Sequence, residues 1–208
     1  MKLYHYMDED YGLINLENRR IKASTFNRLN DPFELLGIET SNLLIRNALK
    51  ETKRRISSNF GILCFSKIWS NPVQWAHYAN NHKGLCLEIE LSDNCDAQEV
   101  DYVPERLDSS LISSPKFSEK LLLTKFEHWG YEEEYRIIRQ LDNFVKDDEL
   151  YFQPFNDDIK ITKVIIGCQS NITRNHVLER LSDADKDVEI IYSRSAFKSF
   201  KIVKHKNK

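Results

Sequence analysis

The chain is poor in the residues that build phosphate loops, disulfide frameworks and membrane spans. Only 6 of its 208 residues are glycine, and it contains no Walker or G-x-G-x-x-G loop, which excludes the commonest phosphate cradles. Its four cysteines have no C-x-x-C spacing, so we expect reduced thiols and no structural zinc. Since no run approaches the ~18–20 apolar residues of a membrane helix and no signal-peptide core is present, we expect a cytoplasmic protein with no membrane partner.

An excess of charge of one sign is also missing. The 30 Lys and Arg nearly balance the 32 Asp and Glu, which excludes a generally basic nucleic-acid coat but allows a local basic patch. The six histidines show no HxH, HExxH or HxxxH spacing, so we expect no metal site. With 41% hydrophobic residues the chain can bury a core. Its length predicts one compact domain over residues 1–208, and two very small domains are the alternative.

Strand-like and helix-like segments alternate irregularly along the chain. The pattern predicts strands at 2–6, 20–24, 62–65, 85–91, 131–139, 161–166, 188–192 and 197–203, and helices at 40–57, 71–80, 114–128 and 173–181. Residues 85–91 alternate most clearly, which places their leucines and isoleucine inward and Glu88 and Glu90 outward. This order favours an α+β fold with a mixed or antiparallel sheet over a doubly wound sheet.

The stretch Asn27-Arg28-Leu29-Asn30-Asp31-Pro32-Phe33-Glu34 predicts a turn, because Asn and Asp bond their own backbone and Pro fixes φ. Two interpretations stay open. In the first, Phe26 and Phe33 are buried in the core and the turn is purely structural. In the second, a rigid loop presents Asn30 or Asp31 to a ligand.

A buried strand ends at Ser66, and the helix at 71–80 follows at once. Residues at strand ends often line clefts, so Ser66, Trp75, His77 and Tyr78 are candidates for one cleft. The alternative for Trp75 and Tyr78 is ordinary core packing of a helix face.

A third stretch carries Glu132, Glu134 and Arg136, which fall on one face if residues 131–139 form a strand. Neighbouring carboxylates repel, and the pKa of one would rise unless Arg136 offsets the repulsion. Such a group could stabilise a cationic transition state, or it could be a solvated acidic face paired to arginine. The lysine-rich stretch after residue 197 is interpreted first as a solvated terminus and second as a nucleic-acid contact.

Together these segments resemble a bacterial family known as domain of unknown function 2971. The matching segments are Leu3–Tyr6, Phe26–Glu34, Cys64–Ser66, Trp75–Gly84, Val100–Tyr102 and Lys125–Arg136. They lie in order within residues 3–139, and the rest of the chain carries little of the resemblance. The family name implies no activity.

The order of these motifs is also similar, more distantly, to the ADP-ribosyltransferase superfamily. That resemblance implies a split sheet and transfer of ADP-ribose from NAD, the substrate, to a protein or nucleic-acid acceptor. It further implies a toxin or phage-defence effector with an antitoxin or defence-system partner.

The resemblance also implies roles for particular residues. His5 would hold the NAD ribose, and Ser66 with Tyr78 would support the nicotinamide end. Glu134 would orient the ribose 2′-hydroxyl and stabilise an oxocarbenium-like ribose, while Glu132 would position the acceptor. The other residues expected to contact NAD are Trp75, Asn30 and Arg136. The chain departs from the superfamily because it mixes two of its residue patterns, which leaves open whether it is an enzyme.

Two rival functions stay open. The first is a non-catalytic ligand-sensing or interaction module of a bacterial defence system, in which Glu132, Glu134 and Arg136 form only an ion-pair ladder. The second is a nuclease, for which the sequence offers no evident set of metal-binding carboxylates.

Overall fold

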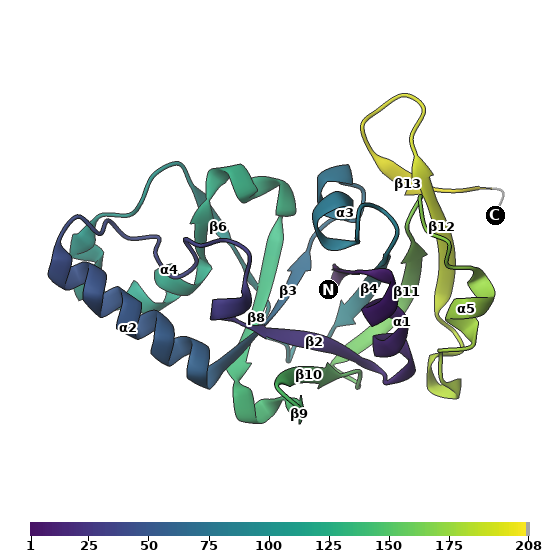
Figure 1. Ribbon diagram of the computed structural model, residues 1–208, viewed down its shortest axis with the longest axis horizontal. Coiled ribbons are helices and arrows are strands. Elements are labelled where there is room, and N and C mark those ends of the chain that lie inside the picture. Colours follow the sequence, from purple (N-terminus) through teal and green to yellow (C-terminus); the bar gives the residue numbers. More distant parts are fainter. Residues whose placement is uncertain (207–208) are drawn as a thin grey trace. The chain divides into compact units, whose positions relative to one another are not determined.

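The computed structural model describes residues 1–206 (Figure 1). The chain divides into two compact units and visits each more than once. The first comprises residues 1–21, 65–95 and the chain from 153 onward, and the second comprises 22–64 and 96–152. The expected α+β class is confirmed, as is a mixed, mostly antiparallel sheet. Within residues 1–206, no helix combines the length and the apolar character required to cross a membrane.

The first unit is built on a mixed sheet. Its elements are β1 (Lys2–Met7), α1 (Glu9–Glu17), α3 (Pro72–Tyr78), β4 (Leu85–Leu91), β11 (Ile159–Ile166), α5 (Arg174–Leu178), η5 (Asp183–Asp185), β12 (Glu189–Ser195) and β13 (Ile202–Lys204). Strand β4 lies between β1 and β11 and is antiparallel to both. Strand β12 is parallel to β11, and α5 lies in the crossover that a parallel pair requires.

Strand β4 covers the residues predicted for it, and its four inward positions are buried as expected. Glu90 is exposed, also as expected. The prediction for Glu88 was wrong, because this side chain is only 4% exposed. Its register partners Tyr4 and Lys163 lie on the two flanking strands, and both donate hydrogen bonds to Glu88 Oε2. Two neighbouring strands thus cover a face that alternation alone assigns to solvent.

The core of the first unit is centred on Trp75 of α3, which is fully buried. It packs with Ala79, Cys86, Ile165, Ile191 and Ile202. The helix begins where the sequence predicts, because the Asn71 side chain accepts from Val73 N and Pro72 occupies the first turn. Trp75 Nε1 donates to the Trp69 carbonyl at 2.7 Å, so its polar atom is satisfied inside the core.

A tight turn joins α3 to β4. Asn80, Asn81 and His82 all have left-handed φ, between 43° and 68°. Gly84 follows, and a Cβ there would lie 2.0 Å from the Met7 carbonyl oxygen. Only glycine therefore allows β4 to pass so close to the end of β1.

The second unit contains one long helix and several short strands. Its elements are β2 (Arg20–Thr25), η1 (Phe26–Arg28), α2 (Leu43–Asn59), β3 (Phe60–Ser66), β5 (Gln98–Glu99), β6 (Asp101–Val103), η2 (Ser109–Ser113), α4 (Phe117–Leu123), β7 (Thr124–Phe126), η3 (Glu127–Glu132), β8 (Glu134–Gln140), η4 (Leu141–Asn143), β9 (Val145–Asp147) and β10 (Leu150–Pro154). The chain passes between the units inside β2, β3 and β10. The core contains Phe26, Leu35, Ile38, Leu49, Ile62 and Leu121.

Several predicted boundaries were wrong. The strand expected at 131–139 begins only at Glu134, because a 3₁₀ turn precedes it and Glu133 adopts left-handed φ of 43°. The helix expected at 114–128 is confined to Phe117–Leu123, and residues 124–126 instead pair in parallel with β6. The strand expected at 197–203 is reduced to Ile202–Lys204. For residues 124–126, pairing with a distant strand overrides the local helical pattern.

The substitution Leu87→Ala tests the core position of β4. Leu87 is fully buried, so removing its side-chain carbons should lower the free energy of unfolding by about 2–5 kcal/mol. Urea denaturation measures this difference. A loss under ~1 kcal/mol would contradict the register of β4, since exposed sites tolerate such changes.

The substitution Glu88→Gln tests the buried ion pair on β4. Burial raises the pKa of Glu88, but hydrogen bonds from Lys2, Thr162 and Lys163 outweigh it and lower the pKa to about 2. The ionised carboxylate therefore contributes stability above its usual pKa of 4.5, which is lost as the pH falls toward 2. Thermal unfolding between pH ~6 and pH ~2 should show a smaller decline in melting temperature for Glu88→Gln than for wild type, because the variant has no carboxylate to protonate at this position. Equal declines would contradict the assignment.

Candidate functional site

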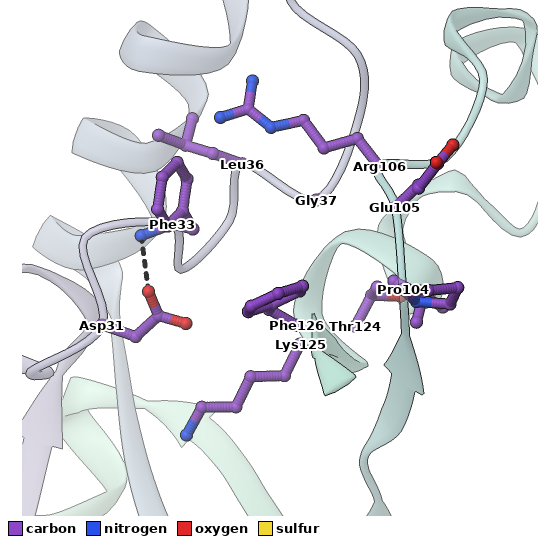
Figure 2. Close-up of a pocket in the computed structure, with 11 residues that line it drawn as sticks. Asp31, Phe33, Leu36, Gly37, Pro104, Glu105, Arg106, Thr124, Lys125 and Phe126 are labelled. Carbon is purple, nitrogen blue, oxygen red and sulfur yellow. Dashed lines mark hydrogen bonds between the residues drawn. The ribbon is translucent and has the colours of Figure 1, made fainter. Parts of the chain in front are cut away.

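A cavity of about 460 Å³ opens in the second unit (Figure 2). It is lined mainly by apolar side chains and aliphatic stems, contributed by three separate segments. The lining residues are Asp31, Phe33, Leu36, Gly37, Val103, Pro104, Glu105, Arg106, Thr124, Lys125 and Phe126. A mostly apolar cavity of this size with a few polar groups is typical of small-molecule sites.

The turn at Asp31 and Pro32 forms one wall of the cavity. Asp31 Oδ1 accepts from the Phe33 backbone N–H at 2.8 Å, and the Asp31 carbonyl accepts from Glu34 N at 3.2 Å. The Asp31 carboxylate is nearly fully buried, at 2% exposure. Its second oxygen points away from the bond to Phe33, on the side of Phe126 (Figure 2). The turn therefore places a carboxylate oxygen at the wall of the cavity.

Phe33 and Phe126 are half exposed at the cavity, at 52% and 43%. Phe26 is buried as expected, but the expectation that Phe33 lies in the core was wrong. The Arg106 guanidinium lies 5.1 Å from the centre of the Phe33 ring, and the Phe126 ring stacks on His128. Thr124 contributes a buried hydroxyl that has no hydrogen-bond partner within residues 1–206.

Beside the cavity lies a buried ion cluster, which comprises Glu34, Lys125, Glu132, Glu134 and Arg136. Every one of these side chains is 7% exposed or less. Arg136 donates from Nε to Glu134 Oε1 at 2.8 Å and from Nη1 to Glu34 Oε2 at 3.0 Å. Its Nη1 also donates to the Leu122 carbonyl at 2.8 Å. Three carboxylates face two cations, so the cluster has one formal negative charge in excess.

Lys125 belongs to both the cavity and the ion cluster. Its stem lines the cavity, while its ammonium turns away from Phe126 (Figure 2) and donates to Glu132 and to Glu134 Oε2. The Trp129 ring covers the ammonium at 4.7 Å. Burial lowers the pKa of Lys125, but Glu134 and Glu132 more than compensate and raise it above its usual range.

The ion cluster keeps Glu134 ionised. Burial by itself raises the pKa of Glu134, but Arg136 and Lys125 overcome this and lower the pKa to about 2. Burial raises the pKa of the Cys64 thiol well above its usual range, and the nearby Glu134 carboxylate raises it further. Cys64 therefore stays a neutral thiol. None of the four cysteines forms a disulfide. Within residues 1–206, no group of three His, Cys, Asp or Glu side chains is arranged to hold a metal ion.

The structure brings together three of the predicted site residues, Glu132, Glu134 and Arg136. The prediction that the three side chains share one face of a strand was wrong, because Glu132 lies in η3. Glu132 is linked to Glu134 through Lys125, which donates hydrogen bonds to both. Asn30 is exposed and does not line the cavity, whereas its neighbour Asp31 does.

The other predicted residues lie in the first unit. Tyr4 pairs with Ser66 across β1 and β3, so His5 points to the opposite face of the sheet from Ser66. The Ser66 hydroxyl donates to the Ile68 carbonyl at 2.8 Å and accepts from Gln74 Nε2 at 3.0 Å, which closes a turn. Trp75 is a core residue, as its alternative interpretation held. Tyr78 is partly buried beside His77.

Asp31, Glu34 and Lys125 are the site residues that reasoning from residue patterns did not single out as a group. Glu34 and Arg136 are 102 residues apart, and no spacing rule connects them. Only Asp31 had a local signal, which was the Asp-Pro turn, and no residue pattern indicated Glu34 or Lys125.

Comparisons with protein-family models, curated proteins and solved structures found no match to this chain.

The substitution Arg136→Ala tests whether the ion cluster is structural. It would leave Glu34 and Glu134 buried without their shared cation, which typically costs about 3–5 kcal/mol of folding stability. The matched control is Arg54→Ala, because Arg54 forms a solvent-exposed pair with Glu51 that should contribute little to folding stability. Urea denaturation of both variants makes the comparison. Equal, small losses would show that the cluster is not required for folding.

Proposed function

We propose that the chain is a non-catalytic ligand-binding module whose site is the cavity of the second unit. The observation that carries the proposal is the Asp31 carboxylate: one oxygen holds the turn and the other faces an apolar cavity. A carboxylate oxygen at a mostly apolar cavity wall can accept a hydrogen bond from an N–H donor on a ligand, and charge makes that bond stronger than a neutral one. The ligand class is therefore a small, flat, mostly apolar molecule with an N–H group.

The two phenylalanines support an aromatic ligand. Phe33 and Phe126 expose ring surface at the cavity, and aromatic groups associate with such rings in stacked or edge-on geometry. The excess negative charge of the ion cluster beside the cavity also favours a neutral or cationic ligand over an anion.

The ion cluster supports a module over an enzyme. A carboxylate that stabilises an oxocarbenium-like ribose must direct its charge at the reacting centre. Both oxygens of Glu134 instead accept hydrogen bonds from Arg136 and Lys125, and the side chain is 6% exposed. This arrangement is that of an ion-pair ladder which supports the cavity wall.

ADP-ribosyl transfer from NAD is the second candidate, and one observation favours it. Arg136 and Lys125 hydrogen-bond to the Glu134 carboxylate and lower its pKa, which favours the ionised form that a transferase carboxylate requires. Nicotinamide and adenine are also flat rings with N–H donors, so the two ring systems of NAD fall within the ligand class of the cavity, whereas its anionic pyrophosphate does not. A protein or nucleic-acid acceptor, and an antitoxin or other defence-system partner, would belong to this second proposal.

Calorimetry with nicotinamide, adenine and NAD tests the proposed module. At least one should bind, and Asp31→Asn should weaken that binding by about tenfold or more, because a charged acceptor oxygen becomes a donor. Asp157→Asn is the matched control, since Asp157 is fully exposed in the first unit. No heat from any of the three compounds at millimolar concentration would overturn the proposal.

Release of nicotinamide from NAD in the presence of cell lysate separates the two candidates. The module predicts no release. The transferase predicts release that falls by ~10²-fold in Glu134→Gln, as expected for a lost electrostatic stabiliser. Glu133→Gln is the control, because Glu133 precedes β8 outside the ion cluster and should keep wild-type release. Release that depends on Glu134 would replace the module with the transferase.

A further inference from the structure

The loop between β12 and β13 carries two almost fully exposed phenylalanines. It forms an arch that stands out from its hairpin (Figure 1). Phe197 is 89% exposed and Phe200 is 98% exposed. Large apolar side chains in such positions contribute nothing to a core, and their grouping in one loop indicates a contact surface.

The backbone of the arch is anchored at its base. Ala196 N donates to the Lys201 carbonyl at 2.9 Å, and Ile202 N donates to the Ser70 carbonyl at 2.8 Å. Ile202 itself is buried in the core of the first unit. The two rings are therefore displayed by a closed loop whose base is fixed to the core.

The loop is also basic in a chain that has a net charge of −2. No Asp or Glu occurs from Ile190 to the end of the sequence, whereas Arg194, Lys198 and Lys201 lie in or beside the loop. Each exposed phenylalanine is followed directly by a lysine. The Arg194 guanidinium lies 4.3 Å from the centre of the Phe197 ring, which adds a cation to one face of that ring.

A hollow of about 520 Å³ lies against this loop. It is lined by Pro72 and by residues 195–202. The loop thus combines open aromatic faces, cations and a concave surface in one place, all within the first unit.

We propose that this loop, residues 196–201, binds single-stranded nucleic acid together with Arg194 at the end of β12. Aromatic side chains that stack on bases, combined with cations that contact the backbone phosphates, are the usual means of binding single strands without sequence preference. Phe197 and Phe200 would stack on bases, Lys198 and Lys201 would contact phosphates, and the hollow would accommodate a base turned out of the strand. A lipid surface fits less well, because a flat bilayer would not fill the concave surface beside the loop. This inference is independent of the cavity in the second unit.

Fluorescence anisotropy with labelled oligo(dT) and oligo(rU) of about 12 nucleotides tests the proposal. Both should bind at ~50 mM salt and weaken steeply as salt rises. The double variant Phe197→Ala/Phe200→Ala should weaken binding by about tenfold or more with an unchanged salt slope. The double variant Lys198→Gln/Lys201→Gln should instead reduce the slope by about 1.4, or ~0.7 per phosphate contact.

The matched controls are Leu44→Ala and Lys50→Gln, because both side chains are exposed on α2 of the second unit. Both should bind oligonucleotides like wild type, and circular dichroism should confirm that every variant is folded. No binding by the wild type, or equal binding by the double phenylalanine variant, would overturn the proposal. Binding to phosphatidylserine vesicles without binding to oligonucleotides would overturn it in favour of a lipid surface.

Discussion

The guanidinium of Arg136 is the group on which the second unit depends. It joins Glu34 of the turn after η1, Glu134 of its own strand and the carbonyl of Leu122 at the end of α4. Glu34 lies 102 residues from Arg136 in the sequence and Leu122 lies 14 residues from it, so the guanidinium joins segments that are not neighbours along the chain. Because the charges are buried, each is stable only while its partners stay in place.

The same network determines the shape of the cavity. Glu34 lies three residues after Asp31, so the ion pair to Arg136 also holds the turn that presents Asp31 and Phe33. Lys125 links the other wall, since its stem lines the cavity while its ammonium is held by Glu132 and Glu134. The carboxylates Glu132 and Glu134 are thus held in the same network as the residues that form the cavity walls.

The first unit also contains a buried carboxylate, but its partners come from neighbouring strands of one sheet. Glu88 lies on a central strand and is neutralised by Lys2 and Lys163, with further hydrogen bonds from Tyr4 and Thr162. Since these partners come from the neighbouring strands, the charge specifies strand register as well as stability. The Phe197–Phe200 loop differs from this buried site, because its phenylalanines and lysines face solvent.

The sequence by itself determined the elements whose signals are local. These include β4, from its alternation; the start of α3, from Asn71 and Pro72; and the turn at Asp31 and Pro32. Tertiary structure decided the burial of Glu88, the exposure of Phe33, the helical position of Glu132 and the short strands β5, β6, β7, β9 and β10. The α+β class could be predicted because periodicity and turn chemistry depend on near neighbours. The ion cluster and its cavity could not, since the burial and charge of Glu34, Lys125 and Arg136 depend on partners that only the folded chain brings within hydrogen-bonding distance.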